Sequence, residues 1–126
     1  MLKSIKLLIV GRPISKKNSR LWIKRGGKRF LVPSKAYSTF ETDAIIQIKK
    51  QTKGALRPIF SNEVYVDYEF RMKGSIRADT DNLMVGINDI LQKAGVIADD
   101  NLITGGFFNK ISGYKDWETN VVIYYL

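Results

Sequence analysis

Apolar and polar residues alternate along several segments of the chain, and this spacing predicts β-strands. Residues 63–72, EVYVDYEFRM, alternate strictly and predict a strand with one buried face. Residues 2–10 and two segments near 102–111 and 117–125 are rich in apolar and β-branched side chains, so they predict three further strands. The polar segment SGYKD between the last two is expected to form their turn.

Two other segments repeat apolar residues every three or four positions, which predicts helices with one buried face. The first is expected from its cap, Ser34, to about residue 53, with Gly54 as its stop. The second is expected over about residues 80–94 and ends at Gly95. The expected apolar faces are Tyr37, Phe40, Ala44, Ile45 and Ile48 on the first helix and Leu83, Ile87, Ile90, Leu91 and Ala94 on the second.

A glycine pair separates two short apolar segments before the first helix. Residues 21–23 and 30–32 flank KRGGKR, in which Gly26-Gly27 is a two-residue hairpin signal. The elements follow the order strand, hairpin, helix, strand, helix, strand, strand. This order predicts an α+β fold over residues 1–126: a single domain in which two main helices pack on a mixed β-sheet, with a basic β-hairpin arm.

Composition narrows the chemistry that this domain can perform. The chain has no cysteine and no histidine, which excludes disulfides, thiolate or imidazole metal ligands and serine-type triads. Any catalysis must therefore use carboxylates, lysines or hydroxyls. With 44% hydrophobic and 26% charged residues, and an N-terminal apolar segment that Lys6 interrupts, we expect a soluble, cytoplasmic protein without a membrane partner.

Positive charge is concentrated in the first third of the chain. Of 21 Lys and Arg residues, eleven lie in residues 1–40, and the first acidic residue is Glu41. A solubilising surface or attraction to anionic lipid are alternatives, but no amphipathic helix accompanies the charge, so nucleic acid is favoured. The expected phosphate contacts are Arg12, Lys16, Lys17, Arg20, Lys24, Arg25, Lys28 and Arg29, with Lys73 and Arg77 further along. Trp22 and Phe30 are expected either to stack on unpaired bases or to pair across the hairpin.

Acidic residues gather instead between positions 79 and 100, where five of the twelve lie. An Asp at a helix start commonly caps free N–H groups. Capping needs one carboxylate, however, whereas Asp79 and Asp81 with Asn82 supply three side chains with hard oxygen donors, which suit Mg²⁺. The later pair Asp99-Asp100 is consistent with either a solvated turn or a cation site. Composition and spacing leave these alternatives open.

The order of these motifs resembles the RusA family of Holliday junction resolvases. The matching positions are Asp79-Thr80-Asp81-Asn82-Leu83, then Asp89, Lys93-Ala94-Gly95 and Asp99-Asp100, with a looser match at Pro13, Ser15 and Asn18. The resemblance implies a homodimeric endonuclease that cuts paired strands of four-way DNA junctions with Mg²⁺. It also implies that Asp79, Asp81 and Asp100 are the catalytic, metal-binding residues, with one or two Mg²⁺ ions. Asp89 and Asp99 are expected to support the site without binding metal.

One position departs from the family pattern. RusA-like proteins usually carry a lysine four residues after the second aspartate of D-x-D, and here that position is Val85. Residues four apart are neighbours on a helix, so such a lysine would lie beside Asp81. Val85 is expected either to pack against a partner chain or to mark altered chemistry, with Lys73, Arg77 and Lys16 as possible substitute cations.

Three functions remain open from the sequence. The first is a junction-cutting nuclease, the second a junction-binding protein with weak or lost cleavage, and the third a non-enzymatic single-strand-binding module. Geometry adds one expectation: the second helix advances about 20 Å from Asp81 to Ala94. Residues 95–100 return that distance only if nearly extended. Asp100 is therefore expected to complete the site barely within its own chain, or in a neighbouring one.

Overall fold

A five-stranded mixed sheet and a separate two-stranded hairpin carry the fold. The computed structural model describes residues 2–16, 19–75 and 77–126. The elements in chain order are β1 Lys3–Val10, β2 Arg20–Arg25, β3 Lys28–Pro33, α1 Lys35–Gln51, β4 Val64–Lys73, α2 Thr80–Lys93, the short 3-10 helix η1 Asp100–Leu102, β5 Ile103–Gly105, β6 Phe108–Tyr114 and β7 Glu118–Tyr125.

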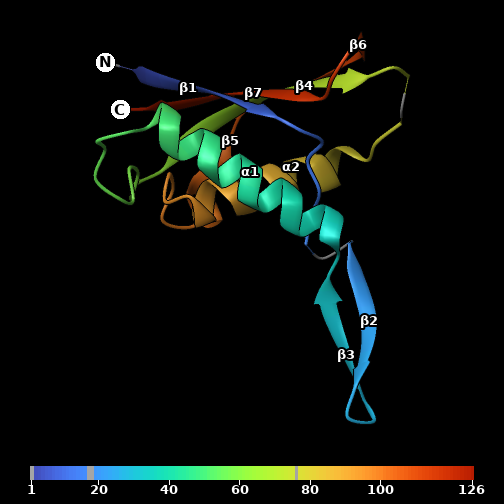
Figure 1. Cartoon of the computed structure of the whole chain (residues 1–126). Helices are drawn as coiled ribbons and strands as arrows, with labels where there is room; N and C mark the ends of the chain where they lie inside the picture. The colour runs from blue at the N-terminus through green and yellow to red at the C-terminus, as the bar shows by residue number, and fades with distance from the viewer. Residues whose placement is uncertain (1, 17–18, 76) are drawn as a thin grey trace.

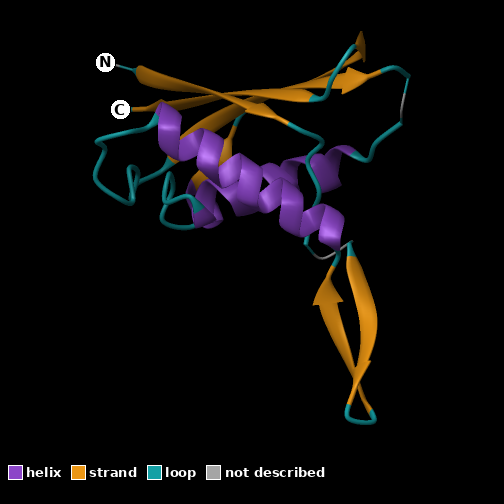
Figure 2. Cartoon of the chain, in the orientation of Figure 1, coloured by secondary structure: helices purple, strands orange, loops and turns teal. Residues whose placement is uncertain are grey.

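The sheet runs in the order β1, β7, β4, and the other side of β4 pairs with both β5 and β6. Strand β7 is antiparallel to β1 and to β4, whereas β5 and β6 are parallel to β4. Both helices cover the same face of this sheet (Figure 2). This arrangement confirms the expected α+β architecture with a mixed sheet and two packed helices.

The buried faces of the elements are those that the apolar spacing predicts. On β4, Val64, Val66, Tyr68 and Phe70 are buried, and the expected apolar face of α2 is buried throughout. Of the five residues of the expected apolar face of α1, four are buried and Ile45 is partly buried, packed against the core. The helix ends also follow local chemistry, since the Ser34 hydroxyl accepts the backbone N–H of Tyr37 and caps α1. Of the helices in the described part of the chain, none has the length and apolar character needed to cross a membrane.

Two glutamines of α1 cover the open edge of β1. The Gln51 side chain accepts the backbone N–H of Leu8 at 2.8 Å and donates to its carbonyl oxygen at 2.7 Å. Gln47 makes the same pair of hydrogen bonds with Val10, at 2.7 and 2.9 Å. These side chains form hydrogen bonds with backbone N–H and C=O groups that an unprotected edge strand would leave available for pairing with another chain.

One sequence expectation about the strands is wrong. The single strand expected near 102–111 is two strands, β5 and β6, and β6 continues through part of the expected turn to Tyr114. The break falls at Gly106, which has a φ of 144° and lies so close to β4 that a Cβ there would be 1.8 Å from the carbonyl oxygen of Val66. Only glycine fits such an approach. Asp67 holds the next residue by accepting the N–H of Phe107 at 2.9 Å.

The expected basic arm is present as the β2–β3 hairpin, which projects away from the sheet and helices (Figure 1). Its turn residues Gly26 and Gly27 have φ values of 56° and 77°, as a tight hairpin turn requires. Trp22 lies opposite Leu31, and Ile23 lies opposite Phe30. Trp22 and Phe30 therefore pair across the strands with aliphatic side chains and face opposite sides of the hairpin, yet they remain 61% and 45% exposed.

Candidate functional site

Two of the three aspartates that the family resemblance indicates lie together at the start of α2. Asp79 is the N-cap of this helix, and its Oδ1 accepts the backbone N–H of Asp81 at 2.9 Å. Capping by Asp79, one of the sequence alternatives, is thus confirmed. Asp81 lies in the first turn, and both carboxylates are exposed. The partial positive charge of the helix N-terminus stabilises this concentration of negative charge.

The third aspartate, Asp100, lies near the opposite end of α2. Its backbone N–H donates to Oε1 of Gln92 at 3.1 Å, because the chain after the helix stays close to it: the N–H of Val96 donates to the carbonyl of Leu91. Gln92 follows Asp81 by eleven positions, which corresponds to about 16 Å of helix. Within residues 2–16, 19–75 and 77–126, no three acidic residues gather closely enough to hold a metal ion.

A pocket opens beside Asp79, between the loop after β4, the start of α2 and β6. Its lining includes Arg77, Asp79, Lys110, Ser75 and Ser112. The Nζ of Lys110 donates to the backbone carbonyl of Ala78 at 3.1 Å. Of the candidate substitute cations that the sequence suggests, Arg77 is the one that lines this pocket.

Sequence reasoning missed Lys110. Thirty residues lie between Asp79 and Lys110, and no motif marks this lysine. It approaches Asp79 only because β6 pairs in parallel with β4. This pairing places Lys110 opposite Phe70, near the end of β4 from which the chain continues to α2. The sequence offers no local signal for that pairing.

The basic loop after β1 reaches the middle of α2. The backbone of Ile14 lies so near Gly86 that a Cβ there would be 3.0 Å from the Ile14 carbonyl oxygen. This contact brings Lys16 within electrostatic reach of Asp89. Burial raises the pKa of the Asp89 carboxyl, the charges of Lys93 and Lys16 oppose that rise, and the negative charge of Asp100 adds to it. Asp89 is therefore a half-buried carboxylate in a mixed charge environment, distinct from the exposed pair.

Two further contacts hold α2 against its neighbours. The Tyr68 hydroxyl donates to Oδ1 of Asn88 at 2.6 Å, and burial raises the pKa of Tyr68 to about 12. Lys93 donates to Glu41 at 2.7 Å and to the Tyr37 hydroxyl at 2.8 Å, which ties α2 to α1. These contacts fix the orientation of the helix that carries the carboxylates.

Val85 is 42% exposed, on the turn of α2 that follows Asp81. A valine supplies no charge there. Lys73, at the end of β4, and Lys16 are both exposed, but neither lines the pocket that contains Asp79. The described cations that line the pocket beside Asp79 come from outside the helix.

All described residues of the expected phosphate-binding set are exposed, namely Arg12, Lys16, Arg20, Lys24, Arg25, Lys28, Arg29, Lys73 and Arg77. Lys17 lies outside the described residues. Two of the guanidinium groups stack on tryptophans: Arg29 lies 4.8 Å from the ring centre of Trp22, and Arg12 lies 5.2 Å from that of Trp117. These contacts orient side chains that otherwise point into solvent.

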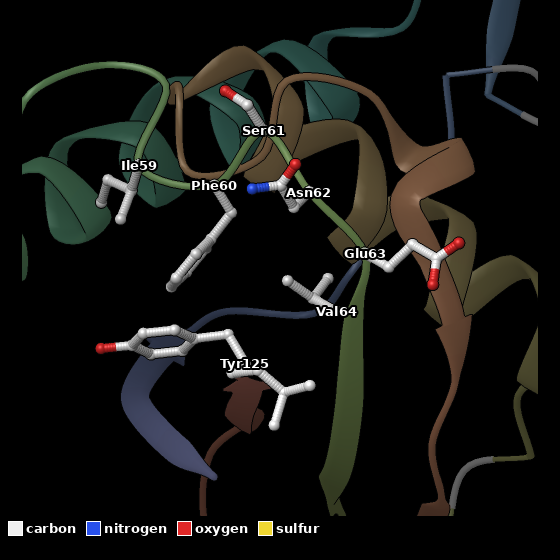
Figure 3. A pocket seen from close by; sticks show the side chains of 8 residues that line it. Ile59, Phe60, Ser61, Asn62, Glu63, Val64 and Tyr125 are labelled. Atoms are coloured by element: carbon white, nitrogen blue, oxygen red, sulfur yellow. The ribbon is translucent and has the colours of Figure 1, made fainter. Parts of the chain in front are cut away.

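A second pocket lies away from these residues. It is lined by the segment before β4 and by the chain end, where Phe60 and Tyr125 face each other with ring centres 4.7 Å apart (Figure 3). This pocket is at the start of β4, whereas Asp79 follows its end, and a ten-residue strand spans about 33 Å. Glu63 is the only charged residue among those that line it. The candidate site is therefore at the carboxylates and not at this second pocket.

Exposed carboxylates next to cations, on an α+β domain with a protruding basic arm, are typical of a protein that acts on nucleic-acid phosphodiesters. Comparisons with known proteins agree with this class of protein and specify an endodeoxyribonuclease family within it. Residues 11–124 match the family described as Endodeoxyribonuclease RusA, and the chain belongs to that family. A relative from Aquifex aeolicus (strain VF5), named crossover junction endodeoxyribonuclease RusA, is 32% identical over 102 residues, which cover 81% of this chain and 76% of the relative. The resemblance seen in the sequence is confirmed.

Proposed function

We propose that this chain is a Mg²⁺-dependent, structure-selective DNA endonuclease that resolves four-way junctions by paired phosphodiester hydrolysis. The observation that carries the proposal is the exposed carboxylate pair, Asp79 and Asp81, beside a cation-lined pocket in a member of an endodeoxyribonuclease family. The name of the Aquifex aeolicus relative supports a junction as the substrate.

The chemistry of the donor set fits magnesium. Carboxylate oxygens are the hard ligands that Mg²⁺ takes, and two carboxylates, Asp79 and Asp81, lie two positions apart at the start of one helix. In this proposal Asp79 and Asp81 hold the ion, which supplies an activated water and charge stabilisation at the phosphate. Asp79 also caps α2, and the hydrogen bond that it accepts from the backbone N–H of Asp81 holds its side chain at the helix start.

We further propose that Asp100 of a second copy completes the ligand set in a homodimer. Within one chain the backbone N–H of Asp100 is hydrogen-bonded to the side chain of Gln92. Gln92 lies about three helical turns from Asp81. A dimer with twofold symmetry would bring two such sites to opposed strands of a junction, which itself has approximate twofold symmetry. The basic arm would hold the phosphate backbone without reading bases, because phosphate contacts position a protein whereas base contacts specify sequence.

Cleavage of a labelled four-way junction, with and without Mg²⁺, tests the proposed activity. Asp81→Asn should abolish cleavage while junction affinity stays equal or rises, since it removes a ligand and a charge that repels phosphate. Asp89→Asn, which changes a carboxylate outside the pair, should have a mild effect. Equal loss from both substitutions would show that the acidic surface acts as a whole and that no discrete site exists.

Complementation tests the shared site. Asp81→Asn and Asp100→Asn chains, each inactive alone, should regain nicking when mixed and allowed to exchange subunits. In such a heterodimer one of the two sites keeps every aspartate if ligands come from both chains. If each chain holds its own complete site, the mixture stays inactive.

A second candidate, a junction-binding protein with weak or lost cleavage, is favoured by one observation. Val85 supplies no cation next to Asp81, although it is exposed. Preference for junctions over linear duplex at equal salt, without Mg²⁺-dependent nicking, would select this alternative.

A further inference from the structure

The pocket beside Asp79 has the composition of an anion-binding site. Two cationic side chains, Arg77 and Lys110, and two hydroxyls, Ser75 and Ser112, line it, and Asp79 is the one carboxylate among the lining residues. Excess positive charge with hydroxyl donors suits a phosphodiester, which carries one negative charge and accepts hydrogen bonds.

Lys110 is positioned to enter this pocket. It is exposed, on β6, and Ser112 lies two residues further along the strand, so both side chains project from the same face of the sheet. Its Nζ reaches the carbonyl of Ala78, the residue directly before Asp79. A carbonyl is a neutral acceptor, and a phosphate oxygen makes a stronger, charge-assisted bond with the same ammonium.

Arg77 lines the same pocket from the loop that leads into α2. The two cations therefore come from elements far apart in sequence, which converge only in the fold. Together they outweigh the charge of Asp79, the carboxylate they adjoin. The pocket thus offers a phosphate position beside Asp79, the first carboxylate of the pair, with both of its cations supplied from outside α2.

We propose that Lys110, with Arg77, binds the DNA phosphate that lies next to Asp79 and Asp81 during cleavage. The inference rests on the proposed nuclease function and assigns the cation of that site to β6. It predicts that Lys110 makes one phosphate contact whose loss weakens binding and also slows cleavage.

The test compares Lys110→Met with Lys115→Met. Each change removes one exposed lysine charge and keeps an unbranched side chain, but Lys115 lies in the turn after β6 and does not line the pocket. Junction affinity is measured across a salt series in EDTA, where no cleavage occurs. Lys110→Met should make the log-log slope shallower by about 0.9, the value for one duplex phosphate contact, whereas Lys115→Met should leave it unchanged.

The second measurement is the single-turnover cleavage rate in Mg²⁺ at saturating protein. Lys110→Met should lower this rate by at least about tenfold, Lys110→Arg should retain most of it, and Lys115→Met should match the wild type. A slope or a rate for Lys110→Met equal to that of Lys115→Met overturns the inference. If wild-type protein binds junction and linear DNA alike and cuts neither, the proposed function falls; a wild type that cuts while Lys110→Met is unaffected refutes only the role of Lys110.

Discussion

Removal of the four basic side chains nearest the hairpin turn should take away much of the salt dependence of DNA binding. Lys24 and Arg29 are paired across the hairpin, as are Arg25 and Lys28, and all four are exposed at the tip of an arm that projects from the body (Figure 1). The perturbation is the simultaneous replacement of these four residues by alanine. The turn itself depends on Gly26 and Gly27, which the variant retains.

The size of the effect follows from the number of charges. Each phosphate contact contributes roughly −0.9 to the slope of log affinity against log salt, so four contacts contribute about −3.6. Between 50 and 200 mM salt this share of the slope amounts to about a 150-fold change in affinity. The quadruple variant should therefore bind much more weakly at low salt but lose far less of its remaining affinity as salt rises.

The assay is equilibrium binding of a labelled four-way junction over that salt range, in EDTA. A matched control replaces four other exposed lysines, Lys49, Lys50, Lys53 and Lys115, which lie outside the arm. The control carries the same change in net charge, so it corrects for long-range electrostatic attraction. Circular dichroism and thermal unfolding verify that both variants keep the fold.

Equal slopes for the arm variant and the control would refute the assignment. Such a result would mean that the arm is not the DNA-binding element and that its charge acts only through the net charge of the protein. A shallower slope in the arm variant alone would establish that these side chains contact phosphates.

Three further outcomes are expected. Val85→Lys should change single-turnover cleavage by less than about threefold because the pocket beside the carboxylate pair already holds two cations; a rise of about a hundredfold would show that a cation is missing there. Burial alone would raise the pKa of Glu41, but the hydrogen bond from Lys93 opposes this rise, and the resulting pKa lies below 4.5. The pair therefore stabilises the fold above pH 4.5, and this stabilisation is lost as the pH falls through the lowered pKa. Urea unfolding of Glu41→Gln should show a loss of up to about 1 kcal/mol at pH 7 that vanishes in acid. Replacement of Gln47 and Gln51 by alanine uncovers the β1 edge. It should lower the free energy of unfolding by about 1 to 3 kcal/mol, measured by urea titration, and promote concentration-dependent association, measured by sedimentation.

The sequence by itself determined the two helices, the hairpin and most of the strands, with their buried faces, because these depend on local spacing. Tyr68 and Phe70 are buried where alternation predicts it, Ile87 and Ile90 are buried where the helical period predicts it, and Gly26 lies in the predicted hairpin turn. Capping of α2 by Asp79 was readable for the same reason, since a cap involves only neighbouring residues.

The tertiary structure decided which distant segments meet. The break at Gly106 depends on contact with Val66 in another strand, and no pattern within residues 102–111 indicates that contact. The position of Lys110 beside Asp79 depends on the parallel pairing of β6 with β4. Asp100 remains beside Gln92 because the chain after α2 bonds back to that helix. Local propensity is encoded within a few residues, whereas strand pairing and chain return are set by the packing of the whole core.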